Sequence, residues 1–130
     1  MKYFSIPVIM LMAVLAACEK KAEQTVDGMS AFHTVMAESW HPVGDSGNFE
    51  PAKRLAADLE QRARDWSAAV GADAETSAAL NVLIDSCASF RKAVEIGKPD
   101  SLLRPTLAEI HHIFHKLHEK AESHEGSGHH

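Results

Sequence analysis

Histidine is concentrated at the carboxyl-terminal end of this 130-residue chain, where seven of its nine histidines fall within the last twenty residues. Three of them, His111, His115 and His118, are spaced so that they would share one side of a helix. Imidazole is the commonest protein ligand of transition metals, and its charge changes near neutral pH. The pattern therefore indicates either a metal site or a solvated helix flank on which histidines pair with glutamates such as Glu119.

Two more histidines precede this cluster in the chain. His33 falls on the apolar face of the first predicted helix, and His41 stands before Pro42 at the end of that helix. Counting residues from the helix ends places His33 level with His111 and His115 if the first and last helices are antiparallel neighbours. Histidines four residues apart can chelate one ion. We therefore predict a zinc or copper site formed by these three histidines, with His41 as a fourth ligand if the His-Pro turn folds back over it.

Two alternatives concern the residues around His33. On an apolar face, this histidine could instead be a core residue that donates a hydrogen bond to a backbone carbonyl. Met29 and Met36 lie about one turn on either side of it, and thioether sulfur would favour copper among the transition metals. Both methionines also fit the apolar stripe of the helix, so core packing explains them without a ligand.

A di-iron carboxylate site is a further alternative. Glu38 with His41, and Glu109 with His112, have the Glu-x-x-His spacing that such bundles use. By helical angle, however, both glutamates fall towards the outer side of their helices. The second and third predicted helices supply no convincing inward glutamate, so this alternative is disfavoured.

The elements that must position these residues are four helices, predicted from apolar stripes at helical spacing. They cover approximately residues 26–40, 51–70, 73–96 and 101–121. No strand pattern competes with them, and the short connections make neighbouring helices antiparallel. The sequence therefore predicts an all-α, up-down-up-down four-helix bundle.

Proline and glycine mark the expected ends of these helices. Pro42 is expected to end the first helix and to begin a loop over residues 41–49. Gly71 is a plausible end for the second helix. Gly97 followed by Pro99 should end the third, in the order typical of helix carboxyl termini.

The amino-terminal segment predicts export. Lys2 precedes an apolar run that reaches Ala17, which is typical of a secretory signal peptide over residues 1–17. The run ends in Leu15-Ala16-Ala17-Cys18, which resembles the lipobox of bacterial lipoproteins. That resemblance implies cleavage before Cys18, lipidation of this cysteine and, because Glu19 follows it, outer-membrane sorting on the periplasmic side. An ordinary signal peptide with a chance cysteine is the alternative.

The expected domain organisation follows from these segments: a lipidated cysteine and tether over residues 18–25, a four-helix bundle over 26–122 and a flexible tail over 123–130.

Charge, cysteine content and motifs limit the classes of protein to which the chain could belong. A formal net charge of −5 argues against nucleic acid and against a basic membrane-binding patch. With Cys18 lipidated, Cys87 has no disulfide partner and is expected to be a small core residue. No nucleophile motif or phosphate-binding loop is evident, so we do not expect an enzyme.

The helical layout also resembles that of cytochrome c-prime and soluble cytochrome b, which are exported bundles with a histidine late in the last helix. The resemblance implies a b-type haem as an alternative cofactor, bound by Met29 or Met36 together with His111 or His115. Covalently attached haem is excluded because the sequence has no Cys-x-x-Cys-His motif.

Two segments, Phe32-His33…Trp40-His41-Pro42 and Ile110-His111…Phe114-His115, resemble the paired histidine motifs of small exported helical lipoproteins. No activity follows from this likeness, but it supports treating the four histidines as one set. A lipoprotein that only contacts an unknown protein partner, without any ligand, is the remaining interpretation.

Overall fold

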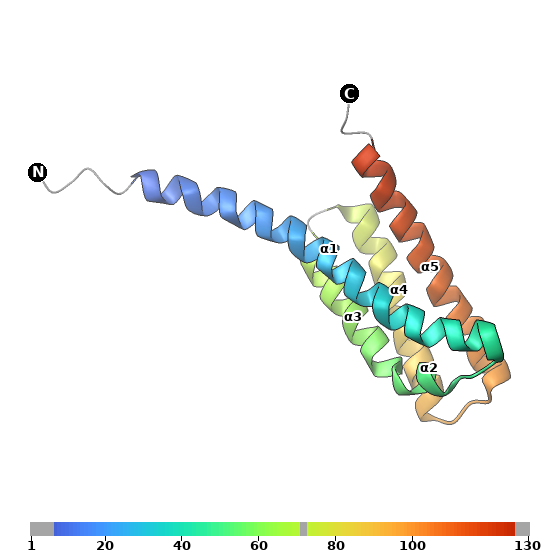
Figure 1. The fold of residues 1–130 in the computed structure, drawn as a ribbon. Coiled ribbons are helices and arrows are strands. Elements are labelled where there is room, and N and C mark those ends of the chain that lie inside the picture. The colour runs from blue at the N-terminus through green and yellow to red at the C-terminus, as the bar shows by residue number, and fades with distance from the viewer. Residues whose placement is uncertain (1–6, 71–72, 127–130) are drawn as a thin grey trace, which may run out of the picture.

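The computed structural model describes residues 7–70 and 73–126, with side chains described for 27–70 and 73–123. This part of the chain contains helices and no strand. The all-α class predicted from the sequence is therefore confirmed, but the described helices number five. They are α1 (Pro7–Ser46), α2 (Glu50–Arg54), α3 (Ala56–Ala69), α4 (Ala74–Glu95) and α5 (Asp100–Gly126) (Figure 1).

The long helices pack along one another in sequence order. α1 contacts α3, α3 contacts α4, α4 contacts α5, and α5 in turn contacts α1. The amino-terminal half of α1 extends beyond the other helices and includes most of the predicted leader and tether (Figure 1). None of the helices in the described part of the chain combines the length and apolar character needed to cross a membrane.

The core is built from the apolar stripes that the sequence predicted. Phe32 and Met36 from α1 are fully buried, and the stripes of the later helices meet them. Those stripes contribute Leu59, Ala63, Trp66, Leu80, Leu83, Cys87, Phe90, Leu103, Leu107, Ile110, Phe114 and Leu117. Cys87 is a free, fully buried thiol, which confirms its expected role in the core. Burial, with a smaller effect from the charge of Glu60, raises the pKa of this thiol to about 12.

The first helix does not end at Pro42, so the prediction of a loop over residues 41–49 is wrong for residues 41–46 and correct for residues 47–49. Proline removes one backbone hydrogen bond and costs a helix interior about 3 kcal/mol. The extra turn buries Val43 to 1% exposure, and full burial of such a side chain contributes roughly 1.5–3 kcal/mol. Burial thus largely offsets the cost of the proline. The helix ends instead at Ser46, followed by Gly47 at φ +68°.

The second predicted helix is divided at Leu55, which explains the additional helix. Leu55 has φ −94° and ψ 3°, outside helical geometry. Helix-type hydrogen bonds still run from Leu55 N to Pro51 O and from Leu59 N to Leu55 O, each 2.9 Å long. The break is therefore a local kink between α2 and α3. The predicted end at Gly71 lies outside the described residues; α3 itself ends at Ala69.

The ends of α4 follow the sequence signals closely. Asp73 caps its start by accepting a hydrogen bond from the backbone N–H of Glu75. At the other end, Gly97 has φ +74°, and the backbone N–H of Lys98 donates to the carbonyl of Ala93. This Schellman geometry confirms the helix end predicted at Gly97.

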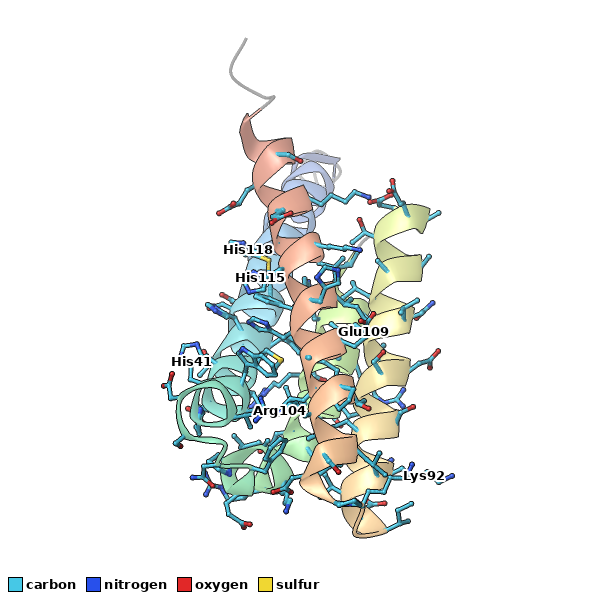
Figure 2. The ribbon with its side chains drawn as sticks, turned by 90° about the vertical axis from the view of Figure 1, so that its right-hand side faces the viewer. His41, Lys92, Arg104, Glu109, His115 and His118 are labelled. Atoms are coloured by element: carbon cyan, nitrogen blue, oxygen red, sulfur yellow. The ribbon has the colours of Figure 1, made fainter. Side chains whose placement is uncertain are left out.

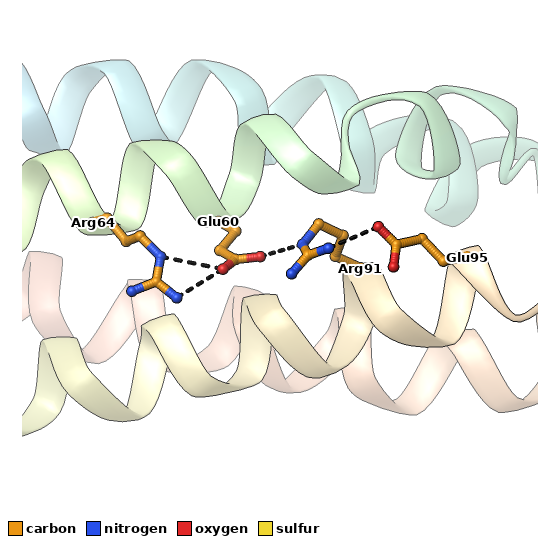
Figure 3. A network of polar contacts seen from close by, with 4 residues as sticks. All are labelled: Glu60, Arg64, Arg91 and Glu95. Atoms are coloured by element: carbon orange, nitrogen blue, oxygen red, sulfur yellow. Dashed lines mark hydrogen bonds and ion pairs between the residues drawn. The ribbon is translucent and has the colours of Figure 1, made fainter.

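A charged network joins α3 to α4 at a position the sequence analysis did not single out (Figure 3). Glu60 is only 8% exposed. It accepts hydrogen bonds from Arg91 of α4 and from Arg64, whose Nη2 lies 2.8 Å from Oε1. Arg91 also donates to Glu95 at 2.7 Å. The bonds from Arg91 and then Arg64 lower the pKa of Glu60, so this carboxylate remains charged.

Arg91→Ala should lower the free energy of unfolding by about 1–3 kcal/mol, because it leaves a nearly buried carboxylate with a single cationic partner. Arg64→Ala should cost less, since this arginine is half exposed. The measurement is urea unfolding followed by circular dichroism. Arg62→Ala, which breaks only an exposed pair with Asp65 at 3.9 Å, is the control. An Arg91 variant as stable as this control would contradict the structural role of the network.

Candidate metal centre

His111 and His115 meet on the surface of α5. Their Nε2 atoms are 3.0 Å apart, and their ring planes are perpendicular. The contact is an N–H···N hydrogen bond when one ring carries its proton on Nε2 and the other does not. Two nitrogens bound to one zinc ion at about 2.0–2.1 Å would lie roughly 3.3 Å apart in tetrahedral geometry. The pair therefore already has nearly the separation that a bidentate metal site requires.

His111 is the half-buried member of the pair and is covered by Trp40 of α1. The two rings are stacked, with centroids 4.9 Å apart and an interplanar angle of 20°. Burial lowers the pKa of His111, and the charges of His115, His41 and His33 add to this effect in that order. Since neutral imidazole is the form that binds metal, the lowered pKa keeps His111 available as a ligand at neutral pH.

His33 lies level with the pair, as predicted, but not on the inner face of α1. Its ring stacks on Phe114, with centroids 5.1 Å apart and an interplanar angle of 13°. Phe114 directly precedes His115 in α5. Because His33 is exposed, both the expected inward orientation and the core-histidine alternative are wrong.

His41 is exposed on α1, directly after Trp40 (Figure 2). No His-Pro turn folds back here, because α1 continues through Pro42. The helix itself nevertheless brings His41 close enough to α5 that its charge acts on the pKa of His111 more strongly than that of His33 does. The His-Pro turn by which His41 was expected to join the site is therefore absent.

The four predicted ligands do not all converge on one point. Among the described residues, no group of three or more His, Cys, Asp or Glu side chains is arranged to hold a metal ion. The structure brings His111 and His115 together and places His33 and His41 beside them on the neighbouring helix. Glu109, of the di-iron alternative, lines a groove with residues of α4, on another side of α5 (Figure 2).

Two aromatic residues, Phe114 and Trp40, position the histidine rings, a role that was not predicted from the sequence. Phe114 contacts the rings of His33, His115 and His118, with centroid distances of 5.1, 5.7 and 5.8 Å. Trp40 covers the ring of His111, the other member of the pair on α5. The contact with His118 could have been found from helical spacing, since Phe114 lies four residues before it. The contacts between helices could not, because they depend on how α1 and α5 are aligned.

No family model matches the chain, and the searches of curated proteins and of solved structures found no match. Side chains are not described for Cys18, the predicted lipidation site, or for the terminal histidines His129 and His130.

Proposed function

We propose that this protein binds one transition-metal ion through His111 and His115, with His33 and His41 of α1 completing the ligand set. The observation that carries the proposal is the 3.0 Å separation of the two Nε2 atoms on α5. The role would be metal buffering, sensing or delivery, without catalysis. An ion bound by histidines of both helices would link α1 to α5.

Zinc or copper(II) fits this ligand set best. Imidazole suits both ions, whereas copper(I) favours softer thioether or thiolate sulfur. Met36 is fully buried in the core, and Met29 packs against the core, so their sulfur atoms are engaged in packing. Packing also argues against haem. The rings of Phe32, Trp66 and Phe114 fill the core beside the site, with centroids 5.7–6.2 Å apart.

The finer architecture is also part of the proposal: an antiparallel up-down-up-down bundle, in which α2 and α3 together act as the second helix. Lys120, late in α5, forms an ion pair with Glu75 at the start of α4 at 2.8 Å. Contacts between α1 and α5 likewise run in opposite order, from His33 to Phe114 and from Trp40 to His111. These pairings support opposite directions for the helices concerned.

We further propose that the metal-binding domain is held at the periplasmic face of the bacterial envelope, most simply the outer membrane, by a lipid on Cys18. The support is the sequence Leu15-Ala16-Ala17-Cys18 after an apolar run. In this arrangement the membrane and the metal ion are the partners of the protein, and nucleic acid is not, given its net charge of −5.

The test uses the full chain with His124, His129 and His130 replaced by alanine (the tail-substituted chain), so that tail histidines cannot contribute. Zinc titrated into this protein at pH 7.5 should bind by calorimetry with high affinity. Affinity should fall as the pH drops below about 6.5, because protons then compete for the imidazole nitrogens. His33→Ala and His41→Ala, tested separately, should each weaken binding.

Three other results would contradict the proposal in distinguishable ways. A Soret absorption band after purification with haem present would favour the haem-binding alternative. Neither metal binding nor a Soret band would leave a lipoprotein that acts only through contacts with another protein. Binding unaffected by removal of both His111 and His115 would show that the ion is held elsewhere.

A further inference from the structure

We propose that α5 carries a second metal position, formed by His118 and Glu122, beyond the His111–His115 pair. It would take zinc or copper(II), ions that accept mixed imidazole and carboxylate ligands. The inference goes beyond the proposed function, because it uses two side chains that have no part in the first site.

The two side chains have the spacing and accessibility that a bidentate site needs. His118 and Glu122 are four residues apart on α5, with Nε2 and Oε1 separated by 3.8 Å. Nitrogen and oxygen ligands of one zinc ion would lie roughly 3.3 Å apart, so a small rotation closes the pair around an ion. Both side chains are accessible to solvent, at 38% and 67% exposure, so a dissolved ion can reach the pair.

Phe114 restricts the ring of His118 to the surface that also carries the first site. The two ring centroids are 5.8 Å apart, and the same phenyl ring contacts His33 and His115. An imidazole already held against an aromatic ring loses less side-chain entropy when it binds a metal. His118 is therefore better placed to act as a ligand than its spacing alone suggests.

The two lysines in this part of α5 lie at another groove, which leaves the carboxylate of Glu122 available to a cation. Lys116 and Lys120 both line the groove between α4 and α5, and Lys120 is paired there with Glu75 at 2.8 Å. When His118 is neutral, its contact with Glu122 is not an ion pair, and its ring nitrogen can bind a metal. The carboxylate also offsets the charge of a second cation placed close to the first.

The two metal positions would lie one after the other along the same face of α5. Seven residues, or two helical turns, separate the corresponding members of the two pairs, so both pairs lie on nearly the same face. At a rise of about 1.5 Å per residue, the two ions would be roughly 10 Å apart. Because the second position has only two protein ligands, it should be the weaker of the two.

The experiment is a copper(II) titration of the tail-substituted chain, followed by calorimetry and by electron paramagnetic resonance of frozen samples. Two binding steps are expected. In Glu122→Gln the dissociation constant of the weaker step should rise at least about tenfold, with the stronger step unchanged. Glu119→Gln, an exposed glutamate on a neighbouring position of the same helix, is the matched control and should change neither step. Dipolar broadening from ions roughly 10 Å apart should appear only at the second equivalent.

Removing the first pair separates this proposal from the one it extends. A chain with His111→Ala and His115→Ala should lose the stronger step and keep the weaker one. Loss of both steps, a single step in the parent chain, or an unchanged weaker step in Glu122→Gln would overturn the second position. Retention of both steps in the double variant would overturn the first site instead.

Discussion

Replacing His111 by alanine should abolish the stabilisation that zinc gives to the folded protein. An ion that binds only the folded state at a concentration of 100 times its Kd raises the free energy of unfolding by about 2.7 kcal/mol. His111 provides one of the two nitrogens that the structure already holds 3.0 Å apart. Loss of an outer-shell partner alone weakens metal sites about 10–100-fold, and loss of a direct ligand should exceed this. The zinc-dependent increase should then vanish at the same metal concentration.

The measurement is urea unfolding of the tail-substituted chain with and without zinc. Without zinc, His111→Ala also removes the ring on which Trp40 stacks, so a cost of about 1 kcal/mol is expected from packing alone. The difference between the two unfolding curves, rather than stability itself, is therefore the test. His112→Ala removes an exposed neighbouring histidine and should keep the full zinc effect. An equal loss of that effect in both variants would show that metal binds the helix non-specifically.

The helices show how far local sequence signals determine this fold. The end of α4 at Gly97 was predictable, because a residue with positive φ and a following proline act locally. Pro42 was misleading, because burial of Val43 in the core, which depends on the packing of the other helices, largely offsets the local penalty. The kink at Leu55 has no glycine or proline to announce it, so no rule based on neighbouring residues could locate it.

Some features of the candidate site could likewise be predicted from local sequence, whereas others depend on contacts between helices. The pairing of His111 with His115 follows from the helical repeat and was predicted. Counting residues predicted that His33 lies level with His111 and His115 of α5. It did not predict that His33 is exposed, because a small rotation of α1 decides whether a residue at the edge of its apolar stripe is buried. The link from Glu60 to Arg91 joins residues 31 positions apart, and only the packing of α3 on α4 reveals it.

Phe114→Ala should have the largest effect on stability of any variant considered, lowering the free energy of unfolding by about 3–5 kcal/mol. The side chain is 2% exposed and packs against the rings of Phe32 and Trp66, at centroid distances of 5.7 and 6.2 Å. Its removal would leave a cavity where α1, α3 and α5 meet. Urea unfolding measures this loss, and a cost below about 1.5 kcal/mol would contradict the packing described here.

Phe114→Leu separates the role of this ring in the core from its role at the surface. Leucine keeps most of the apolar volume, so the variant should lose only about 1–1.5 kcal/mol of stability and remain folded. It removes the flat face on which His33 stacks and against which His115 and His118 rest. Zinc affinity should therefore fall although no ligand has changed, because the imidazoles must then be ordered by the ion itself. Unchanged zinc affinity in a folded Phe114→Leu protein would mean that this ring serves the core alone and that the histidines need no aromatic support.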